Sequence, residues 1–316
     1  MATESPIPSR SSLMDWSLAL YRHTVKRVRP LHQATHWLMS RSLIPLLERR
    51  QRFQTLPDDP FWFRLELLTG RHEVETAHWM RALARPGMTV LDIGAHVGYY
   101  TRMVSGLVGE RGRVIAFEPH PRNLQTLRHN TAHLRNVTVL PVALAEQEGT
   151  AELHDYLMMS ASGSLHFDER MREVQRAQMS DYDIAPRVKG FQPQTYTVRT
   201  ARVDDLLAAE GIERVDLIKM DIEGAELGAL RGMAATIASS HGLALIMEYN
   251  PLGLAAFGHD PEDALREVLA LGFDRLSVIE PDATLTDYTA QPEALRALTA
   301  SLVQRMGVVN LLIQRA

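Results

Sequence analysis

Short apolar runs alternate with longer amphipathic segments from residue 86 onward, and this alternation predicts the fold. The runs are five to eight residues long and rich in Val, Ile and Leu, which is typical of strands buried on both faces of a sheet. The segments between several of them have helical periodicity, so the pattern predicts βαβ units and a mostly parallel sheet in an α/β fold. Strands are predicted at 89–93, 113–117, 137–141, 215–222, 243–249, 273–279 and 308–313.

The end of the predicted sheet and one long insertion depart from this alternation. No long helix is evident between the strands at 273–279 and 308–313, so we expect them to form an antiparallel edge. Alternating segments at 150–157 and 196–203 predict two further strands. Between these lies a Met-, Arg- and Gln-rich insertion, residues 160–194, whose length is typical of a functional lid or a disordered segment.

The region before the predicted sheet has a different composition. Residues 1–10 predict a disordered leader, and residues 11–60 predict a basic helical extension that Pro30 and Pro45 divide into separate helices. A short strand or helix is expected at 61–65 and a helix at 73–83. Residues 61–316 are predicted to form a single domain that contains the insertion.

The net charge and its distribution along the chain bear on which binding partners we expect. The 316 residues contain 34 Lys+Arg and 38 Asp+Glu, a net charge of −4 that argues against nucleic-acid binding through a basic surface. Residues 1–56 alone contain nine basic and three acidic residues. Two roles stay open for residues 11–56: contact with an anionic membrane face or an acidic partner, and an ordinary helical cap with solvated Arg side chains.

The lack of cysteine and of a long apolar stretch indicates the cellular compartment that we expect. The absence of cysteine excludes disulfides, thiolate metal sites and cysteine nucleophiles. No apolar stretch is long enough to span a membrane, and the early apolar run lacks the pattern of a signal peptide. We therefore expect a cytoplasmic protein, with peripheral contact at the inner membrane face as an option for residues 11–56.

A glycine-rich turn after the first predicted strand indicates a ligand. Asp92 stands near the end of this strand, and Gly94 and Gly98 permit a sharp turn that brings the backbone close to a ligand. The next helix presents its N-terminal N–H groups at the turn. Glu118 ends the second strand, where a carboxylate accepts hydrogen bonds from both hydroxyls of a ribose.

This pattern favours S-adenosyl-L-methionine over a dinucleotide. A dinucleotide fingerprint requires a glycine at position 96, and His96 stands there. S-adenosyl-L-methionine has no phosphate, and its amino-acid end offers an ammonium group to acidic or backbone acceptors. The glycine turn together with Glu118 therefore predicts this cofactor, and no resident metal is expected.

Several segments resemble those of the FkbM-type methyltransferases, over roughly residues 70–316. The most specific is the run from Asp221 to Glu226, which reads DIEGAE; the others are 90–101, 117–123, 136–145, 162–165 and 230–232. The resemblance implies a class I, Rossmann-like sheet of seven strands, mostly parallel with an antiparallel edge strand. It also implies S-adenosyl-L-methionine-dependent methylation of hydroxyls of sugars, glycolipids or polyketides. His96 departs from the family, which usually carries Asn there.

The resemblance assigns roles to individual residues. The methionine part of the cofactor is expected beside Asp92, Gly94, Ala95, His96 and Gly98. The ribose and adenine are expected beside Glu118, Pro119, His120 and Ala143. The transferred methyl group is expected beside Asp221.

Methyl transfer to a hydroxyl also requires a base, because the alcohol must lose a proton. The candidates are the carboxylates Asp221, Glu223, Glu226 and Glu248, with His154, His166 and His259 as alternatives. Clustered carboxylates that hold a divalent cation are a further alternative. Lys219 has strand parity with Asp221, which predicts an ion pair. The residues expected to contact the acceptor are Ser164, His166, Glu226 and Asn250, although Glu226 has an alternative role at a helix N-terminus.

The expected partner is a small-molecule or glycan acceptor, and a homo-oligomer stays open. An amino-group methyltransferase acting on protein or nucleic acid is the alternative enzyme. It is disfavoured because Asp221-Ile222-Glu223-Gly224 stands where those enzymes often carry Asp/Asn-Pro-Pro-aromatic. A non-catalytic module that retains the cofactor fold is the third hypothesis, and absence of cofactor binding would support it.

Overall fold

The computed structural model describes residues 29–155, 160, 163–165 and 194–315. It divides the chain into two compact units, residues 1–52 and 53–316. The predicted leader and most of the predicted insertion, His166 included, lie outside the described residues. The predicted domain ranges therefore stay predictions.

Within the first unit, the described residues form one long helix, α2 (Arg29–Gln51). Pro30 stands in its first turn, where a missing N–H costs nothing, but Pro45 lies inside the helix. The prediction that Pro45 ends a helix is therefore wrong. Leu, Arg and Glu, which favour helices, flank this proline, and a proline removes only one hydrogen bond of the ladder. No helix of the described ranges combines the length and the apolar composition needed to cross a bilayer.

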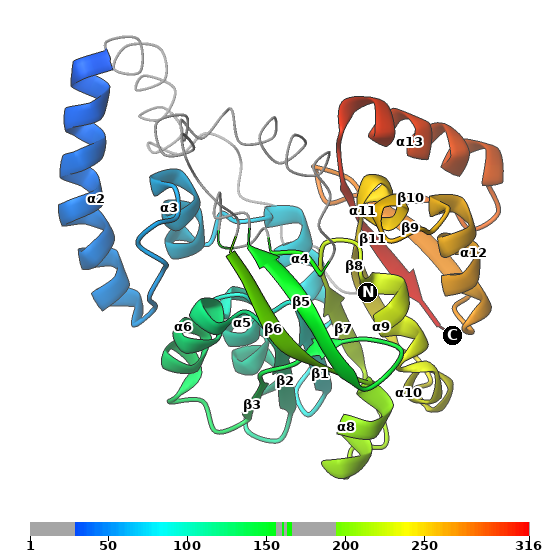
Figure 1. Ribbon diagram of the computed structural model, residues 1–316. Coiled ribbons are helices and arrows are strands. Elements are labelled where there is room, and N and C mark those ends of the chain that lie inside the picture. Colours follow the sequence, from blue (N-terminus) through cyan, green and yellow to red (C-terminus); the bar gives the residue numbers. More distant parts are fainter. Residues whose placement is uncertain (1–28, 156–159, 161–162, 166–193, 316) are drawn as a thin grey trace, which may run out of the picture. The chain divides into compact units, whose positions relative to one another are not determined.

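A central sheet of eight strands forms the second unit (Figure 1). The strands are β1 (Thr89–Ile93), β2 (Arg113–Phe117), β3 (Val137–Leu140), β7 (Leu217–Met220), β8 (Ala244–Tyr249), β9 (Arg275–Ile279), β10 (Leu285–Asp287) and β11 (Val309–Gln314). Their order is β10-β9-β11-β8-β7-β1-β2-β3, and the run from β3 to β8 is parallel. The seven predicted strands are all present, and the short β10 is the eighth.

The antiparallel end of the sheet is more elaborate than the sequence suggested. β11 lies between β8 and β9 and is antiparallel to both, while β10 pairs antiparallel with β9 at the edge. The expectation that no long helix separates β9 from β11 is wrong, because α13 (Pro292–Arg305) fills that connection. α13 carries the chain from β10 past β9 to β11, and β10 and β11 both run antiparallel to β9.

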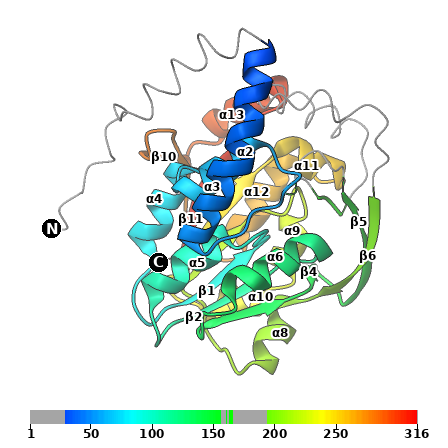
Figure 2. The same cartoon turned by 90° about the vertical axis from the view of Figure 1, so that its left-hand side faces the viewer.

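Helices cover both faces of the central sheet (Figures 1 and 2). One face packs against α4 (Val74–Leu83), α5 (Tyr99–Val108) and α6 (Pro121–Thr131). The other packs against α8 (Val203–Ala209), α9 (Glu226–Arg231), α10 (Ala234–Ser239), α11 (Pro251–Ala256), α12 (Pro261–Ala270) and α13. Neighbouring residues of β1 point to opposite faces: Val90 joins the first cluster and Leu91 the second, and both are fully buried.

Two further elements frame the carboxyl ends of the parallel strands. A small sheet contains β4 (Ala143–Leu144), β5 (Gly149–Asp155) and β6 (Gln194–Ala201), and β5 and β6 confirm the two alternating segments. Figure 2 shows the β5–β6 pair at one side of the central sheet. The segment at 61–65 belongs to the helix α3 (Phe61–Thr69), which ends at Gly70 in the left-handed conformation.

Candidate active site

A cleft lies at the carboxyl ends of β1, β2 and β7, where open α/β sheets bind ligands. It holds about 950 Å³ of space, part of which is open to solvent. Its walls come from these strand ends, from α3 and the loop after it, and from β4 and β5. Nine of the residues predicted from the sequence line it: Gly94, Ala95, His96, Glu118, Pro119, His120, Ala143, Asp221 and Glu223.

The glycine turn is shaped by packing within the protein. Gly94 has a φ of +78°, and a Cβ there would collide with the backbone carbonyl of Asp221. Gly98 has a φ of +90°, and a Cβ there would lie 2.7 Å from Leu127 Cδ1 of α6. Only glycine satisfies both the backbone angle and the space at these positions. The turn therefore lies directly against the end of β7, which brings the two predicted motifs together.

Glu118 lines the cleft and is 5% exposed. Its Oε1 accepts a hydrogen bond from the N–H of His120, and its Oε2 accepts one from the N–H of His96, both at 2.8 Å. Burial raises the pKa of Glu118 to about 7, against the opposing effect of these hydrogen bonds. Each oxygen retains a lone pair, so the carboxylate can still accept from a ligand hydroxyl.

Polar groups around Glu118 continue along one wall of the cleft. His120 Nε2 lies 3.0 Å from Asp155 Oδ2 of β5, and the ring of His120 packs edge-on against Tyr196. Asn123 donates from Nδ2 to the carbonyl of Ser160 at 2.9 Å. Its Oδ1 is buried and has no hydrogen-bond partner in the described part of the chain. This wall therefore offers an unused acceptor beside a carboxylate.

Ser160 connects the glycine turn to the segment before α3. Its N–H and its hydroxyl donate to the two carboxylate oxygens of Asp59, at 2.9 and 2.6 Å. The same hydroxyl lies 2.5 Å from His96 Nε2. Because the hydroxyl has one hydrogen and donates it to Asp59, His96 donates from Nε2. Burial lowers the pKa of His96 to about 3, so this imidazole is neutral.

Charged groups surround the end of β7. Lys219 Nζ donates to Asp221 Oδ2 at 3.0 Å, which confirms the predicted ion pair. Burial lowers the pKa of Lys219, but Asp221, Glu73 and Asp92 outweigh it, and the net shift is upward. Tyr100 donates its hydroxyl to Glu73 Oε2 at 2.8 Å, and the Lys219 ammonium lies 5.2 Å from the Tyr100 ring centroid.

Three further carboxyl groups lie near Asp221, and the pKa of each is raised. Burial, followed by repulsion from Asp221 and Glu226, raises the pKa of Glu223 to about 8. Burial also raises the pKa of Glu226 to about 7, although its Oε1 accepts from the N–H groups of Ile222 and Gly224. Burial and the neighbouring carboxylates raise the pKa of Glu248 well above its usual range.

Other residues predicted from the sequence do not line the cleft, within the residues that the structure describes. Asp92 is fully buried behind the turn and accepts from Thr101. Asn250 caps α11 by accepting from the N–H of Gly253, and Ser164 donates to the carbonyl of Glu223. Within the described residues, five more predicted positions do not line the cleft: Gly98, Glu226, Glu248, His154 and His259. Their predicted cofactor, acceptor and base roles stay predictions.

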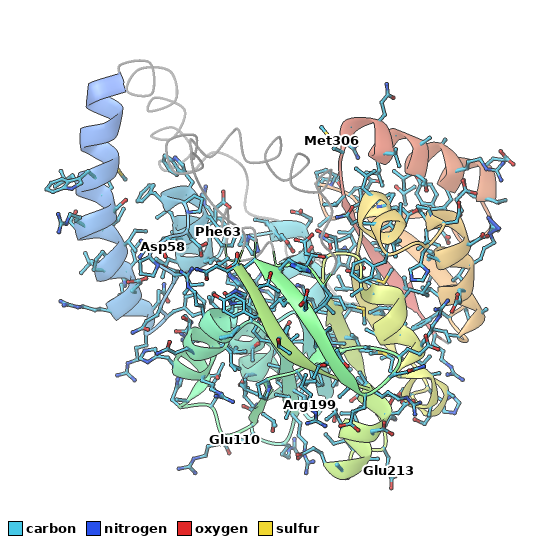
Figure 3. The ribbon with its side chains drawn as sticks, viewed as in Figure 1. Asp58, Phe63, Glu110, Arg199, Glu213 and Met306 are labelled. Carbon is cyan, nitrogen blue, oxygen red and sulfur yellow. The ribbon has the colours of Figure 1, made fainter. Side chains whose placement is uncertain are left out.

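The sequence interpretation missed the wall contributed by residues before the first strand. Phe63 of α3, labelled in Figure 3, lines the cleft together with Leu67 and His72. Asp59 and Glu73 stand behind this wall. A signal was available, because His72 and Glu73 stand only two and three residues after Gly70, the glycine at the end of α3. No three His, Asp or Glu side chains within the described ranges are grouped so that they could hold a metal ion.

Comparison with known proteins gives a consistent result. The family described as Methyltransferase FkbM domain matches residues 92–275, which is more than half of the chain. The 2-O-methyltransferase NoeI of Sinorhizobium fredii is 29% identical over 161 residues, covering 49% of this chain and 61% of NoeI. The 31-O-demethyl-FK506 methyltransferase FkbM of Streptomyces tacrolimicus is 27% identical over 158 residues, covering 47% of this chain and 60% of that protein.

A more distant relative and a solved structure complete the comparison. The hexuronic acid methyltransferase AglP of Haloferax volcanii is 24% identical over 148 residues, covering 47% of this chain and 51% of AglP. The chain thus spans about half to six tenths of the length of these relatives. An O-methyltransferase structure from Thermotoga maritima has a TM-score of 0.40 and 13% identity, covering 87% of this chain and 71% of that one.

Proposed function

Because the chain belongs to the FkbM methyltransferase family, we propose that it is an S-adenosyl-L-methionine-dependent O-methyltransferase whose acceptor is a hydroxyl of a glycan, glycolipid or polyketide-type natural product. The observation that carries this proposal is the buried carboxylate of Glu118 in the cleft beside the glycine turn. A carboxylate at this point of an α/β sheet is suited to the hydroxyls of a ribose.

The residues of the cleft fit this cofactor. Glu118 retains lone pairs for the ribose hydroxyls, and the unused Oδ1 of Asn123 is an acceptor suited to an amino group of the adenine. The cofactor, when bound, supplies a methyl group activated by a sulfonium. Asp221 and the glycine turn would hold the methionine end, since Gly94 lies against the Asp221 carbonyl.

The wall around His72 supports a hydroxyl-rich acceptor. Phe63, Tyr99 and Tyr100 line the cleft with aromatic rings, and Glu223, on the loop after β7, lines it as well. Aromatic faces with a few hydrogen-bonding groups are suited to organic ligands. The name of one relative, a hexuronic acid methyltransferase, favours a sugar among the classes proposed.

We retain contact of residues 11–56 with an anionic membrane surface as a further part of this proposal. Trp37 and Leu38 of α2 are exposed, Arg41 lies 5.1 Å from the Trp37 ring, and Arg49 and Arg50 end the helix. Exposed Trp and Leu beside Arg favour an interfacial helix. Flotation with phosphatidylglycerol vesicles tests it: binding that is unchanged in a Trp37→Ala/Leu38→Ala variant would contradict it.

The experiment that tests the activity starts with the cofactor. Calorimetric titration of the full chain with S-adenosylhomocysteine should show micromolar binding that Glu118→Ala abolishes. Glu110→Ala is the matched control, because Glu110 is exposed and labelled away from the cleft in Figure 3. A panel of neutral methyl glycosides and a methyl glucuronoside then tests the acceptor class, by methylation and by thermal stabilisation with the cofactor product. No binding by the wild type would refute the proposal.

A further inference from the structure

His72 is an unassigned imidazole inside the cleft. It lies in the loop between α3 and α4, and its side chain is 23% exposed. Its ring packs edge-on against Phe63 at a centroid distance of 5.3 Å and against Tyr99 at 5.5 Å, and Tyr100 is at 6.4 Å. These rings fix the plane of the imidazole while leaving part of it accessible to a ligand.

Titratable groups from its own loop and from three other elements lie near His72. Glu73 Oε1 of the same loop lies 3.7 Å from its Nε2, and Glu75 of α4 is also near. Lys219 and Asp221 at the end of β7 are close enough to influence its pKa, and His96 of the glycine turn is a neighbour as well. Burial outweighs the two glutamates and lowers the pKa of His72 below its usual value of 6.5. His72 is therefore neutral at pH 7 and has a lone pair.

The carboxylates at this end of the cleft are poorly placed to accept a proton. Asp221 is already engaged, because its Oδ2 accepts from the Lys219 ammonium at 3.0 Å. Glu223 lines the cleft, but its raised pKa of about 8 keeps it protonated at pH 7. Glu226 and Glu248 do not line the cleft, in the part of the chain that the structure describes.

The other imidazoles of the cleft are engaged elsewhere. His96 donates to Ser160, and burial depresses its pKa to about 3, which makes it a very weak base. His120 pairs with Asp155 beside Glu118, at the end where the ribose and adenine are expected. Among the imidazoles that line the described cleft, His72 thus combines access, neutrality and proximity to Asp221.

We propose that His72 is the general base that removes the proton from the acceptor hydroxyl, an assignment that rests on the proposed O-methyltransferase function. The O–H bond breaks and its proton passes to an imidazole nitrogen of His72, while the oxygen forms its new bond to the methyl carbon. The bond between sulfur and the methyl carbon breaks, and its electron pair stays on sulfur. The imidazolium then releases its proton to water, which restores the neutral ring.

Glu73 is the positioning residue for this base. Its Oε1 faces His72 Nε2 and its Oε2 accepts from the Tyr100 hydroxyl at 2.8 Å, so the carboxylate is anchored on the opposite side. A fixed negative charge beside His72 stabilises the imidazolium that forms during the reaction. The arrangement leaves the nitrogen remote from Glu73 for the acceptor.

The test combines activity with a measurement that needs no turnover. His72→Asn should lower kcat on whichever glycoside of the panel is methylated by about 10²- to 10⁴-fold. It should also remove the acidic limb of the pH–rate profile and change the dissociation constant for S-adenosylhomocysteine by less than about twofold. His129→Asn, at an exposed position of α6, is the matched control. A thiol analogue of the same glycoside, ionised at alkaline pH, should restore most of the activity of His72→Asn.

The second measurement is NMR of the full chain with ring-labelled histidine, titrated with and without S-adenosylhomocysteine. The resonance that His72→Asn removes should titrate below 6.5 and shift when the cofactor product binds. A pKa at or above 6.5, or a resonance that the cofactor product leaves unchanged, overturns the assignment. So does a kcat that His72→Asn leaves intact.

Failure of the two proposals can be distinguished. If the wild type binds S-adenosylhomocysteine but methylates no glycoside, the proposal of a sugar acceptor is refuted. The assignment of His72 as the base is then decided by the NMR titration alone. If the wild type does not bind S-adenosylhomocysteine, the proposed function fails and the assignment of His72 fails with it.

Discussion

Replacing Lys219 with methionine should destabilise the fold strongly, because it leaves buried carboxylates without a counter-charge. Lys219 is 6% exposed at its side chain and lies 3.0 Å from Asp221. Its ammonium also faces Glu73 and the fully buried Asp92, whose pKa burial raises while Lys219 lowers it. Methionine retains the length and apolar stem of lysine and removes the charge.

The magnitude follows from the burial of the partners. Breaking a buried ion pair by removing one partner costs about 3–5 kcal/mol. Asp221 is 27% exposed at its side chain, so water can screen its charge in part, whereas Asp92 has no such access. We therefore expect a loss of about 3 kcal/mol in the free energy of unfolding, at the lower end of that range.

The loss should depend on pH with a definite sign. Without the ammonium, the pKa of Asp92 in the folded state rises further above the value of 3.8 in the unfolded chain. The folded variant then binds more protons than the unfolded chain, so its stability falls as pH rises. The deficit relative to the wild type should be largest at neutral pH and should shrink as the pH is lowered toward 3.8.

Urea unfolding followed by circular dichroism measures this loss. Arg266→Met is the control, because Arg266 is 63% exposed and its ion pair with Asp263 contributes about 0.2–1 kcal/mol. Lys219→Met combined with Asp221→Asn should recover part of the stability. A loss below about 1 kcal/mol at an unchanged m-value, or a loss that does not vary with pH, would refute the reasoning.

Three further outcomes are expected. Gly94→Ala should abolish S-adenosylhomocysteine binding in calorimetry, because its Cβ would collide with the Asp221 carbonyl; Gly87→Ala, which has a φ of +87° and open space, controls for backbone strain alone. Affinity for S-adenosylhomocysteine should increase as pH rises through about 7, because the ionised Glu118 carboxylate is the better acceptor for hydroxyls, and pH-independent calorimetric binding would contradict this. Glu226→Ala should lower the urea-derived stability by about 1–3 kcal/mol, because it leaves two backbone N–H groups of the 222–226 loop without their acceptor, and Glu226→Gln should lose less.

The strands and the cleft were predictable because they follow from local pattern. Runs such as 89–93 and 113–117 are buried on both faces, and their bounds agree with β1 and β2. The glycine turn and Glu118 meet in the cleft because parallel strands end at the same edge of a sheet. Lys219 and Asp221 pair because residues two apart share a face of a strand.

What the sequence could not reveal depends on contacts between distant segments. His72, in the loop before α4, packs against Tyr99, which lies 27 residues further along the chain at the start of α5. No sequence periodicity predicts a contact between these two positions. The sequence left Glu226 open between an acid of the site and a structural role at a helix N-terminus, and only the structure shows that its Oε1 accepts from the N–H groups of Ile222 and Gly224. The helix through Pro45 shows the converse case, in which a local rule is overridden by the propensities of its neighbours.

The position of β11 has a consequence for how the protein is made. Residues 309–314 pair with both β8 and β9, and Leu311 and Ile313 are fully buried. During synthesis, β11 emerges from the ribosome after the other described strands of the sheet. Until then, the edges of β8 and β9 that pair with β11 have no partner. Open strand edges recruit other chains. Synthesis that stalls after α13 would therefore yield an aggregation-prone nascent chain, which chaperones would have to shield until the last strand is inserted.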